Sequence, residues 1–405
     1  MVSTFHGLEL GKRGLSVAQT NITTTGHNIA NANTEGYSRQ KVNSSSTPSL
    51  DVWTNGQTGQ LGTGSQVDSI TRVRDRFLDA QYRDQSATLG EWTVRQETLG
   101  RLEVAINEPS KTGLNAAMDE LNAAWQNVQN NPGDASAQAV LKERAEAVVE
   151  TAQAMNKSMG NITADLELQE TAALEEVAGL MKQIDALNAS IKKSGSQSND
   201  LLDKRDLLVS KLSEIVPVTV KDMKDGTAEV TLPDVFETGT DGTLTLKEDV
   251  EVPGGKLAGI QKSLETVKEY QADLNSTVKK LAEANGDLFT TNPAIEPDAD
   301  FITKLAVGTT VDASTFNKAD FKAAQGEFRT LVSKLGAQSQ TAMNTVANHE
   351  SALLATENRR QSVVGVSIDE EMANLIKYQH AYSAAARFVS TTDELLDTLI
   401  NRMAR

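Results

Sequence analysis

The residue types that most often carry enzyme chemistry are sparse and scattered along this chain of 405 residues. The chain has no cysteine, so it has no disulfide and no thiolate metal site. The common zinc, nucleophile-elbow, phosphate-loop and calcium-loop patterns do not occur. The histidines are His6, His27, His349 and His380, and none lies four residues from another, as a metal-binding pair on a helix would. The sequence therefore predicts no catalytic site, no cofactor and no metal.

Other residues that suggest a site have simpler interpretations. The carboxylates are numerous but lie on predicted helix faces, where a solvated surface is the ordinary explanation. The run from Gly59 to Gly64 lacks the spacing and the preceding buried strand of a phosphate-binding loop, so we interpret it as a turn. Gly7 and Gly11 have the spacing of a close helix contact, but charged neighbours such as Lys12 exclude a lipid bilayer. Close approach of two helices in water stays open for this pair.

Composition and charge restrict the partners. The net charge of −16 argues against nucleic acid or an anionic membrane surface as the main partner. No apolar run approaches the roughly 18 residues of a membrane span, and the start of the chain lacks the pattern of a secretory signal. Aromatic residues make up only 4% of the chain, a composition that favours long exposed helices.

Both ends of the chain are predicted to be helices with a narrow apolar stripe, the pattern of helices that pair in a coiled coil. The stripe of the first helix, about residues 3–32, contains Leu8, Gly11, Leu15, Ala18, Ile22, Thr25 and Ile29. The last helix starts with a capping box of Ser367 and Glu370. Its stripe contains Ile368, Met372, Leu375, Tyr382, Val389, Leu396 and Ile400. Four glycines destabilise the first helix by about 4 kcal/mol relative to alanine, so we expect it to be disordered in the free monomer and helical when docked.

The middle of the chain is expected to alternate between long helices and small β elements. Residues 37–71 should form an extended, hairpin-like element, followed by helices over about 74–106, 114–128, 134–191 and 201–215. The longest of these helices is expected to break near Gly160 or Gly179. Alternating valines from Val216 to Val252 predict a small antiparallel β part. Helices over about 257–281 and 318–358 should flank an irregular stretch at 290–317.

The predicted fold class is mainly α with a smaller β part, in an elongated multi-domain chain that runs out and back. Residues 1–36 and 367–405 are expected to form a terminal coiled-coil domain. Residues 37–212 and 327–366 are expected to form a helical bundle domain that includes the hairpin element. Residues 213–326 are expected to form an outer mixed β/α domain.

The segment that follows the first helix resembles a known signature. It contains Asn28, Ile29, Ala30, Asn31, Thr34, Gly36, Tyr37, Arg39 and Gln40. This segment resembles the N-terminal pattern N-I-A-N-x-x-T-x-G-Y of bacterial flagellar axial proteins, which are the rod, hook and hook-associated proteins. The family often has proline before the glycine; Glu35 stands there in this chain and loosens the predicted turn. Residues 367–396 resemble the closing helix of the same family, so two motifs stand at opposite ends in the family's order.

Blocks at residues 62–75, 201–206, 254–257 and 359–367 resemble the hook-associated members in particular. The resemblance implies a structural protein that joins hook to filament by forming a ring or helical layer. It implies as partners other copies of the chain, the hook protein, a second hook–filament junction protein, an export chaperone and the type III export apparatus. It also implies an extracellular place in the flagellum, reached without a cleaved signal peptide. The chain looks short for the family, so we expect an outermost inserted domain to be missing.

Two alternatives stay open. A rod or hook protein would share both terminal motifs, although the hook-associated blocks argue against it. A wall-active enzyme fused to an axial scaffold would need two carboxylates, or a nucleophile and its base, in one cleft. No such pair is evident in the sequence.

Overall fold

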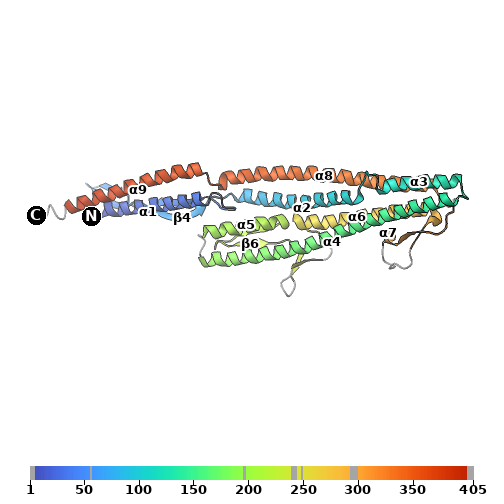
Figure 1. The fold of residues 1–405 in the computed structure, drawn as a ribbon. Coiled ribbons are helices and arrows are strands. Elements are labelled where there is room, and N and C mark those ends of the chain that lie inside the picture. The colour runs from blue at the N-terminus through green and yellow to red at the C-terminus, as the bar shows by residue number, and fades with distance from the viewer. Residues whose placement is uncertain are drawn as a thin grey trace.

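The computed structural model describes residues 5–54, 57–194, 198–238, 244–247, 250–291, 300–312 and 314–398. Within these ranges long helices dominate, and the strands form two-stranded antiparallel sheets. The molecule is elongated, with both chain ends at one end and α3 at the other (Figure 1). The predicted fold class, mainly α with a smaller β part, is therefore confirmed.

The two terminal helices lie side by side. They are α1, His6–Ala30, and α9, Ile368–Asp397. The start of α1 faces the end of α9, since Gly7 lies against Thr392 and Gly14 against Ala385, so the helices run antiparallel. Ser367 caps α9 as predicted, because its side chain accepts a hydrogen bond from the backbone N–H of Glu370.

The extended element predicted after the first helix is present as two strand pairs. β1, Gln40–Ser46, pairs with β4, Ser65–Arg72, and β2, Leu50–Thr54, pairs with β3, Gln57–Leu61. The sheet of β1 and β4 packs beside α1, since Gly64 approaches Leu10 and Arg13 of that helix. This sheet therefore supports α1 beside its contact with α9.

The body of the molecule is built from long helices that run along its axis (Figure 1). They are α2, Arg76–Ile106; α3, Leu114–Asn130; α4, Ala135–Ser194; α5, Asn199–Ile215; α6, Gly255–Ala284; and α8, Lys318–Val364. The sequence placed each of these helices correctly, with boundaries that differ by a few residues. α8 is the exception, because it continues six residues beyond the expected end at Asn358.

The predicted break in the longest helix is wrong, because α4 is one continuous helix of 60 residues, about 90 Å long. Each of its two glycines destabilises it by about 1 kcal/mol relative to alanine. Buried neighbours on the core side outweigh that loss: Met159 and Ile162 stand beside Gly160, and Leu180 follows Gly179. Tertiary packing along the whole length keeps the helix intact.

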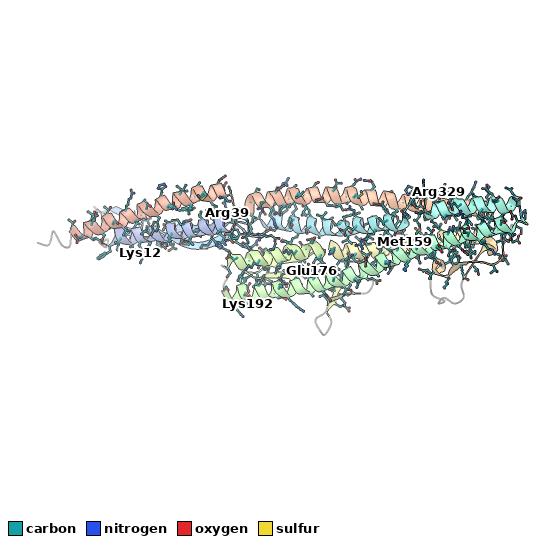
Figure 2. All side chains as sticks on the ribbon, viewed as in Figure 1. Lys12, Arg39, Met159, Glu176, Lys192 and Arg329 are labelled. Atoms are coloured by element: carbon teal, nitrogen blue, oxygen red, sulfur yellow. The ribbon has the colours of Figure 1, made fainter. Side chains whose placement is uncertain are left out.

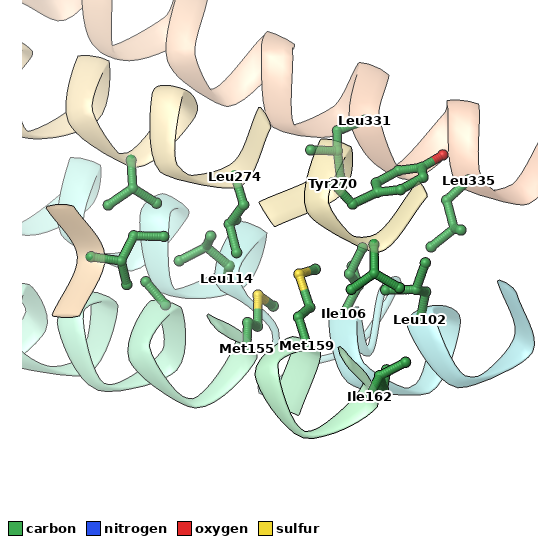
Figure 3. Packing of buried hydrophobic residues seen from close by; sticks show 14 of the residues in the cluster. Leu102, Ile106, Leu114, Met155, Met159, Ile162, Tyr270, Leu274, Leu331 and Leu335 are labelled. Carbon is green, nitrogen blue, oxygen red and sulfur yellow. The ribbon is translucent and has the colours of Figure 1, made fainter. Parts of the chain in front are cut away.

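The apolar core is shared by α2, α3, α4, α6 and α8. Met155 and Met159 of α4 lie between Ile106 and Leu274 from two other helices (Figure 3). At the distal end Trp125 stacks on Phe316, with ring centroids 4.8 Å apart. Because α6 lies within residues 213–326 and shares this core, the outer part of the chain is packed onto the bundle.

The β part contains short antiparallel pairs. β5, Thr219–Asp222, pairs with β6, Ala228–Thr231; β7, Phe236–Thr238, pairs with β8, Leu244–Leu246; and β9, Phe289–Thr291, pairs with β10, Leu305–Val307. A short 3₁₀ helix, Gly286–Leu288, and a helix α7, Phe301–Lys304, complete it. The antiparallel insertion is thus confirmed, although the predicted turn at Asp241 and Gly242 lies outside the described residues.

Two local predictions in this part are wrong. Val216 and Val252 were expected in strands, but Val216 caps α5 and Val252 donates its backbone N–H to the side chain of Gln261. Both valines are fully buried in the helical core, although their alternation with polar residues predicted strands. The stretch at 290–317 was expected to be irregular, yet it contributes most of the β9–β10 pair and all of α7, because Phe289, Ile302 and Leu305 are buried against the bundle.

We expect the body core to set the stability of the protein. Phe328 of α8 is fully buried, so Phe328→Ala should lower the free energy of unfolding by about 3–5 kcal/mol. Leu354 of the same helix is 58% exposed, and Leu354→Ala should change it by less than about 0.5 kcal/mol. Denaturant unfolding of both variants measures the difference, and equal losses would contradict this placement of the core.

Candidate assembly interface

The contact between the terminal helices is made by small side chains of α1. Gly7, Gly11 and Gly14 face α9, and Ala18 is buried further along the same helix. A Cβ atom on Gly11 would lie 2.5 Å from Cγ2 of Val389, closer than atoms can pack. The glycine spacing noted in the sequence therefore allows close approach of two helices in water.

The large apolar residues predicted for the α1 stripe flank this contact. Leu8, Leu15, Ile22 and Ile29 are each half-buried, whereas the small Ala18 and Thr25 between them are buried. The stripe of the sequence is thus divided in the structure. Its small members are buried, with Gly11 against Val389 of α9, and its large members keep part of their surface exposed.

The predicted stripe of α9 is also divided. Leu396 is buried, and Leu375 and Val389 are half-buried. Ile368, Met372 and Tyr382 are exposed, and Ile400 lies outside the described residues. The structure adds further exposed apolar residues that sequence reasoning missed, namely Ile376, Phe388 and Leu395. The sequence could have revealed them, because positions beside a heptad stripe are normally polar in a helix that packs against one partner helix only. Exposed apolar side chains along one helix mark a surface for protein contact.

A buried amide closes the inner end of the helix pair. The Asn28 side chain is 1% exposed and makes four hydrogen bonds. Its Nδ2 donates to the carbonyl of Gln40 at 2.9 Å and to the Glu371 carboxylate at 3.1 Å. Its Oδ1 accepts from the Tyr37 hydroxyl at 2.8 Å and from the Gln40 N–H at 2.9 Å. We name this group of Asn28, Tyr37, Gln40 and Glu371 the Asn28 clamp; it joins α1, β1 and α9.

The tyrosine of the clamp is held in its neutral form. Burial raises the pKa of the Tyr37 hydroxyl, and the nearby Asp200, Asp203 and Glu371 carboxylates raise it further. The hydroxyl therefore keeps its proton and can donate it to Asn28. The ring also packs edge-on against His27, with centroids 5.6 Å apart.

The remaining signature residues shape the turn between α1 and β1. Gly36 has φ of +74°, a conformation that favours glycine, and a Cβ there would lie 3.2 Å from Leu207. The Thr34 hydroxyl donates to Asn31, and the Asn31 amide donates to the carbonyl of His27 at the end of α1. Ile29 is half-buried and Ala30 is exposed, and neither makes a polar side-chain contact.

Two further signature residues, Arg39 and Gln40, contact α9, the end of α8 and the start of α5. Arg39 pairs with Glu370 at 3.1 Å, and its backbone N–H donates to the carbonyl of Val364 at the end of α8. Gln40 donates its side-chain amide to Asp200 at 3.0 Å. Figure 2 shows Arg39 where the terminal helices meet the body. The structure therefore brings the predicted signature residues together at one joint.

The body side of the joint is a network of arginines and aspartates that sequence reasoning did not assign. Ser38 donates its N–H and its hydroxyl to Asp203. Arg72 pairs with Asp203 and Asp206, each at 2.8 Å, and Arg74 pairs with Asp206 at 2.8 Å. Both charged blocks, at residues 70–75 and 201–206, were visible in the sequence, but nothing in it showed that they meet.

Asp206 is the shared carboxylate of this network. Burial alone would raise its pKa, but the cations of Arg74, Arg72 and Arg205 outweigh burial and lower the pKa below its ordinary value of 3.8. The network is thus charged and paired at neutral pH, which suits a structural joint. Among the described residues, no group of three or more histidine, aspartate or glutamate side chains has a metal-binding arrangement.

Three family models match this chain in order. The model of a flagella basal body rod protein matches residues 8–37. The model of the helical domain of flagellar hook-associated protein FlgK matches residues 99–240, and the C-terminal model of flagellar basal body rod FlgEFG proteins matches residues 360–403. The two rod models cover the paired terminal helices, whereas the helical-domain model covers much of the body.

Curated relatives extend the similarity to the full length. Flagellar hook-associated protein 1 of Bacillus subtilis is 29% identical over 502 aligned positions, which cover 100% of this chain and 99% of the relative. The protein of the same name from Escherichia coli is 22% identical, over 96% of this chain and 98% of the relative. Both alignments are longer than this chain, so these relatives contain segments without a counterpart here.

Among solved structures, the flagellar hook junction protein FlgK from Burkholderia pseudomallei is similar to part of this chain. The match has a TM-score of 0.47 and 21% identity, and it covers 52% of this chain and 44% of that structure. In the described part of this chain, no helix is long and apolar enough to cross a membrane.

The small-residue contact gives a matched test within one helix. Gly11→Ala places a methyl group against Val389 and should separate α1 from α9, whereas Gly26→Ala meets no atom within 4 Å. Gly26→Ala should instead stabilise α1 by up to about 1 kcal/mol. Amide exchange over residues 6–20 should become faster in the first variant and unchanged or slower in the second. The same exchange rate in both variants would contradict close packing at Gly11.

The network at the joint predicts an acid-sensitive contribution to stability. Because the folded-state pKa of Asp206 is lowered, its stabilisation is present above the ordinary pKa of 3.8 and is lost as the pH falls through the folded value. At pH 7 Asp206→Asn should lower the free energy of unfolding by about 3 kcal/mol, since it leaves buried arginines without their carboxylate. As the pH falls below about 4, the free energy of unfolding should decrease less for Asp206→Asn than for the wild type.

A control separates this effect from general acid sensitivity. Asp165 is exposed and pairs with exposed Arg101, so Asp165→Asn should change stability by less than about 1 kcal/mol. Denaturant unfolding at pH 7 and at pH 3 measures all three proteins. An acid sensitivity of Asp206→Asn equal to that of the wild type would contradict the role of this carboxylate.

Proposed function

We propose that this chain, which resembles flagellar hook-associated protein 1 along its whole length, is a structural subunit of the hook–filament junction of a bacterial flagellum. The observation that carries the proposal is the full-length similarity, with 100% of this chain aligned to 99% of the Bacillus subtilis relative. Rod-type models at both ends and a hook-associated model in the body support the same role. The body match also favours a junction subunit over the alternative of a rod or hook protein.

The terminal helices are the part of the chain suited to association with other axial subunits. α1 and α9 bury a contact of small side chains and leave Ile368, Met372 and Ile376 exposed. In a ring or helical layer these apolar side chains would be covered by neighbouring copies, which lowers the free energy of the assembly. In the free monomer the terminal pair would form but open frequently, and it would become fully ordered only in the assembly.

We retain the predicted division of the chain into three parts for this proposal. Residues 1–36 and 367–405 would form the assembling part, 37–212 and 327–366 the bundle, and 213–326 the outer part. The Asn28 clamp lies at the boundary between the first two parts, and it couples α1 and α9 to β1. It would hold the assembling part at a fixed orientation on the bundle.

Further partners follow from the same proposal. Beyond its own copies, the subunit would contact the hook protein on one side and a second junction protein on the other. The export chaperone would bind the apolar surface of the last helix before export, and the type III apparatus would export the chain without cleavage of a signal peptide. The named relatives are flagellar structural proteins, so the subunit would act by assembly and without catalysis.

The proposal is tested by genetics in the source bacterium. A strain whose chain lacks residues 370–405 should form hooks without attached filaments and should release filament protein into the medium. Immunogold label against the full-length chain should lie at the hook tip. Normal motility of the deletion strain would overturn the proposal, and label along the whole hook would favour the hook-protein alternative.

A further inference from the structure

A cavity lined by five arginines lies on the body side of the joint. Its volume is about 670 Å³, and it is bounded by β4, the start of α2, α5 and the hairpin of β5 and β6. The arginines are Arg72, Arg74, Arg76, Arg83 and Arg205, and we name this cavity the arginine pocket. Asp79, Asp206 and Asp222 line the same cavity.

Nearby aspartates neutralise four of these five arginines. As described above, Asp203 and Asp206 pair with Arg72 and Arg74. A second contact of Arg74 is to Asp79 at 2.9 Å. Two further pairs complete the set, Arg205 with Asp206 at 2.9 Å and Arg76 with Asp222 at 3.1 Å.

Arg83 is the surplus cation. Within the described part of the chain, its guanidinium has neither a hydrogen-bond nor an ion-pair partner. The side chain is half-buried, and burial lowers the pKa of its guanidinium although nearby carboxylates raise it. A partly desolvated arginine keeps its charge and binds a carboxylate in a planar, two-pronged geometry. The pocket therefore has room for an anionic group and one guanidinium ready to bind it.

The rim of the pocket favours a protein group over a free ion. Met223 lines the pocket and is 39% exposed. Val220 lines the pocket too. Apolar side chains beside an arginine site are typical of protein interfaces, where they contact the segment that carries the acidic residue. Other copies of this acidic chain offer many exposed carboxylates, so charge complementarity favours a second copy as the partner.

We propose that the arginine pocket binds a carboxylate side chain from a neighbouring copy of this chain. This inference rests on the proposed function, because it requires that copies lie side by side in the flagellum. The contact would be made by the body of the subunit, at a distance from the exposed apolar residues of α9. It would therefore add a polar contact that fixes the alignment of neighbouring subunits, beside the apolar association of the terminal helices.

The test is crosslinking in assembled flagella with the full-length chain. A photo-crosslinking amino acid in place of Met223 should give a covalent dimer of the chain, and mass spectrometry should map the second site to a segment containing aspartate or glutamate. Arg83→Gln should lower the dimer yield by about tenfold, because it removes one charge-assisted contact. Arg101→Gln, an exposed arginine on the same helix, should leave the yield unchanged.

A pair of charge reversals controls for misfolding of the Arg83 variant. Arg83→Glu should abolish the dimer, and replacing the mapped carboxylate residue by arginine in the same chain should restore it. A yield that Arg83→Gln does not change would overturn the inference. If immunogold places the chain at the hook tip, crosslinks to another protein alone would also overturn the inference, and so would the absence of any crosslink. Those results would not affect the proposed function. Absence of the chain from flagella would overturn both proposals.

Discussion

The joint at the base of the terminal helices depends on one buried amide. Asn28 joins segments 343 positions apart in the chain, because the same side chain bonds the backbone of Gln40 and the carboxylate of Glu371. An amide is the side chain that offers a donor and an acceptor in the geometry of a peptide group, so it can satisfy both the N–H and the carbonyl of one residue. An aspartate at this position would bring a second carboxylate against Glu371 and lose the donor. The clamp therefore requires asparagine for a physical reason.

Cohesion differs on the two sides of this joint. The body buries large side chains such as Trp125, Tyr270 and Phe328, which contribute roughly 2–3 kcal/mol each by burial of apolar area. On the α1 side, the contact with α9 consists of Gly7, Gly11 and Gly14, which remove little apolar area from water. Close approach of the helices supplies dispersion contacts instead. The terminal pair is thus the part of the chain that gains most from neighbours.

Charge is distributed in a way that matches this division of roles. The net charge of −16 disfavours indiscriminate association between copies of the chain. Against that background, the arginines around Asp206 form a compact network of ion pairs at the joint. In the proposed assembly, apolar contacts between terminal helices would specify register weakly, whereas a charge contact is sensitive to position. Using both kinds of contact would let subunits assemble firmly and in one arrangement.

Sequence alone determined the helices and their capping, because these depend on residues within a few positions of one another. The cap at Ser367 and the extents of α2 and α3 were all predicted from local spacing. The resemblance of residues 28–40 and 367–396 to motifs of flagellar axial proteins was also visible in the sequence alone. The continuity of α4 across Gly160 was decided by tertiary packing, since local propensity favoured a break.

Tertiary structure alone decided which faces meet. Periodicity placed Leu8 and Gly11 on one stripe, but only the partner helix selected the small side chain for contact and left the large one at its edge. Likewise, Arg72 and Asp206 are far apart in the chain, and local patterns carry no information about such a pair. Contacts between distant segments depend on how whole helices pack. That packing fixed the Asn28 clamp, the charge network and the surplus of Arg83 together.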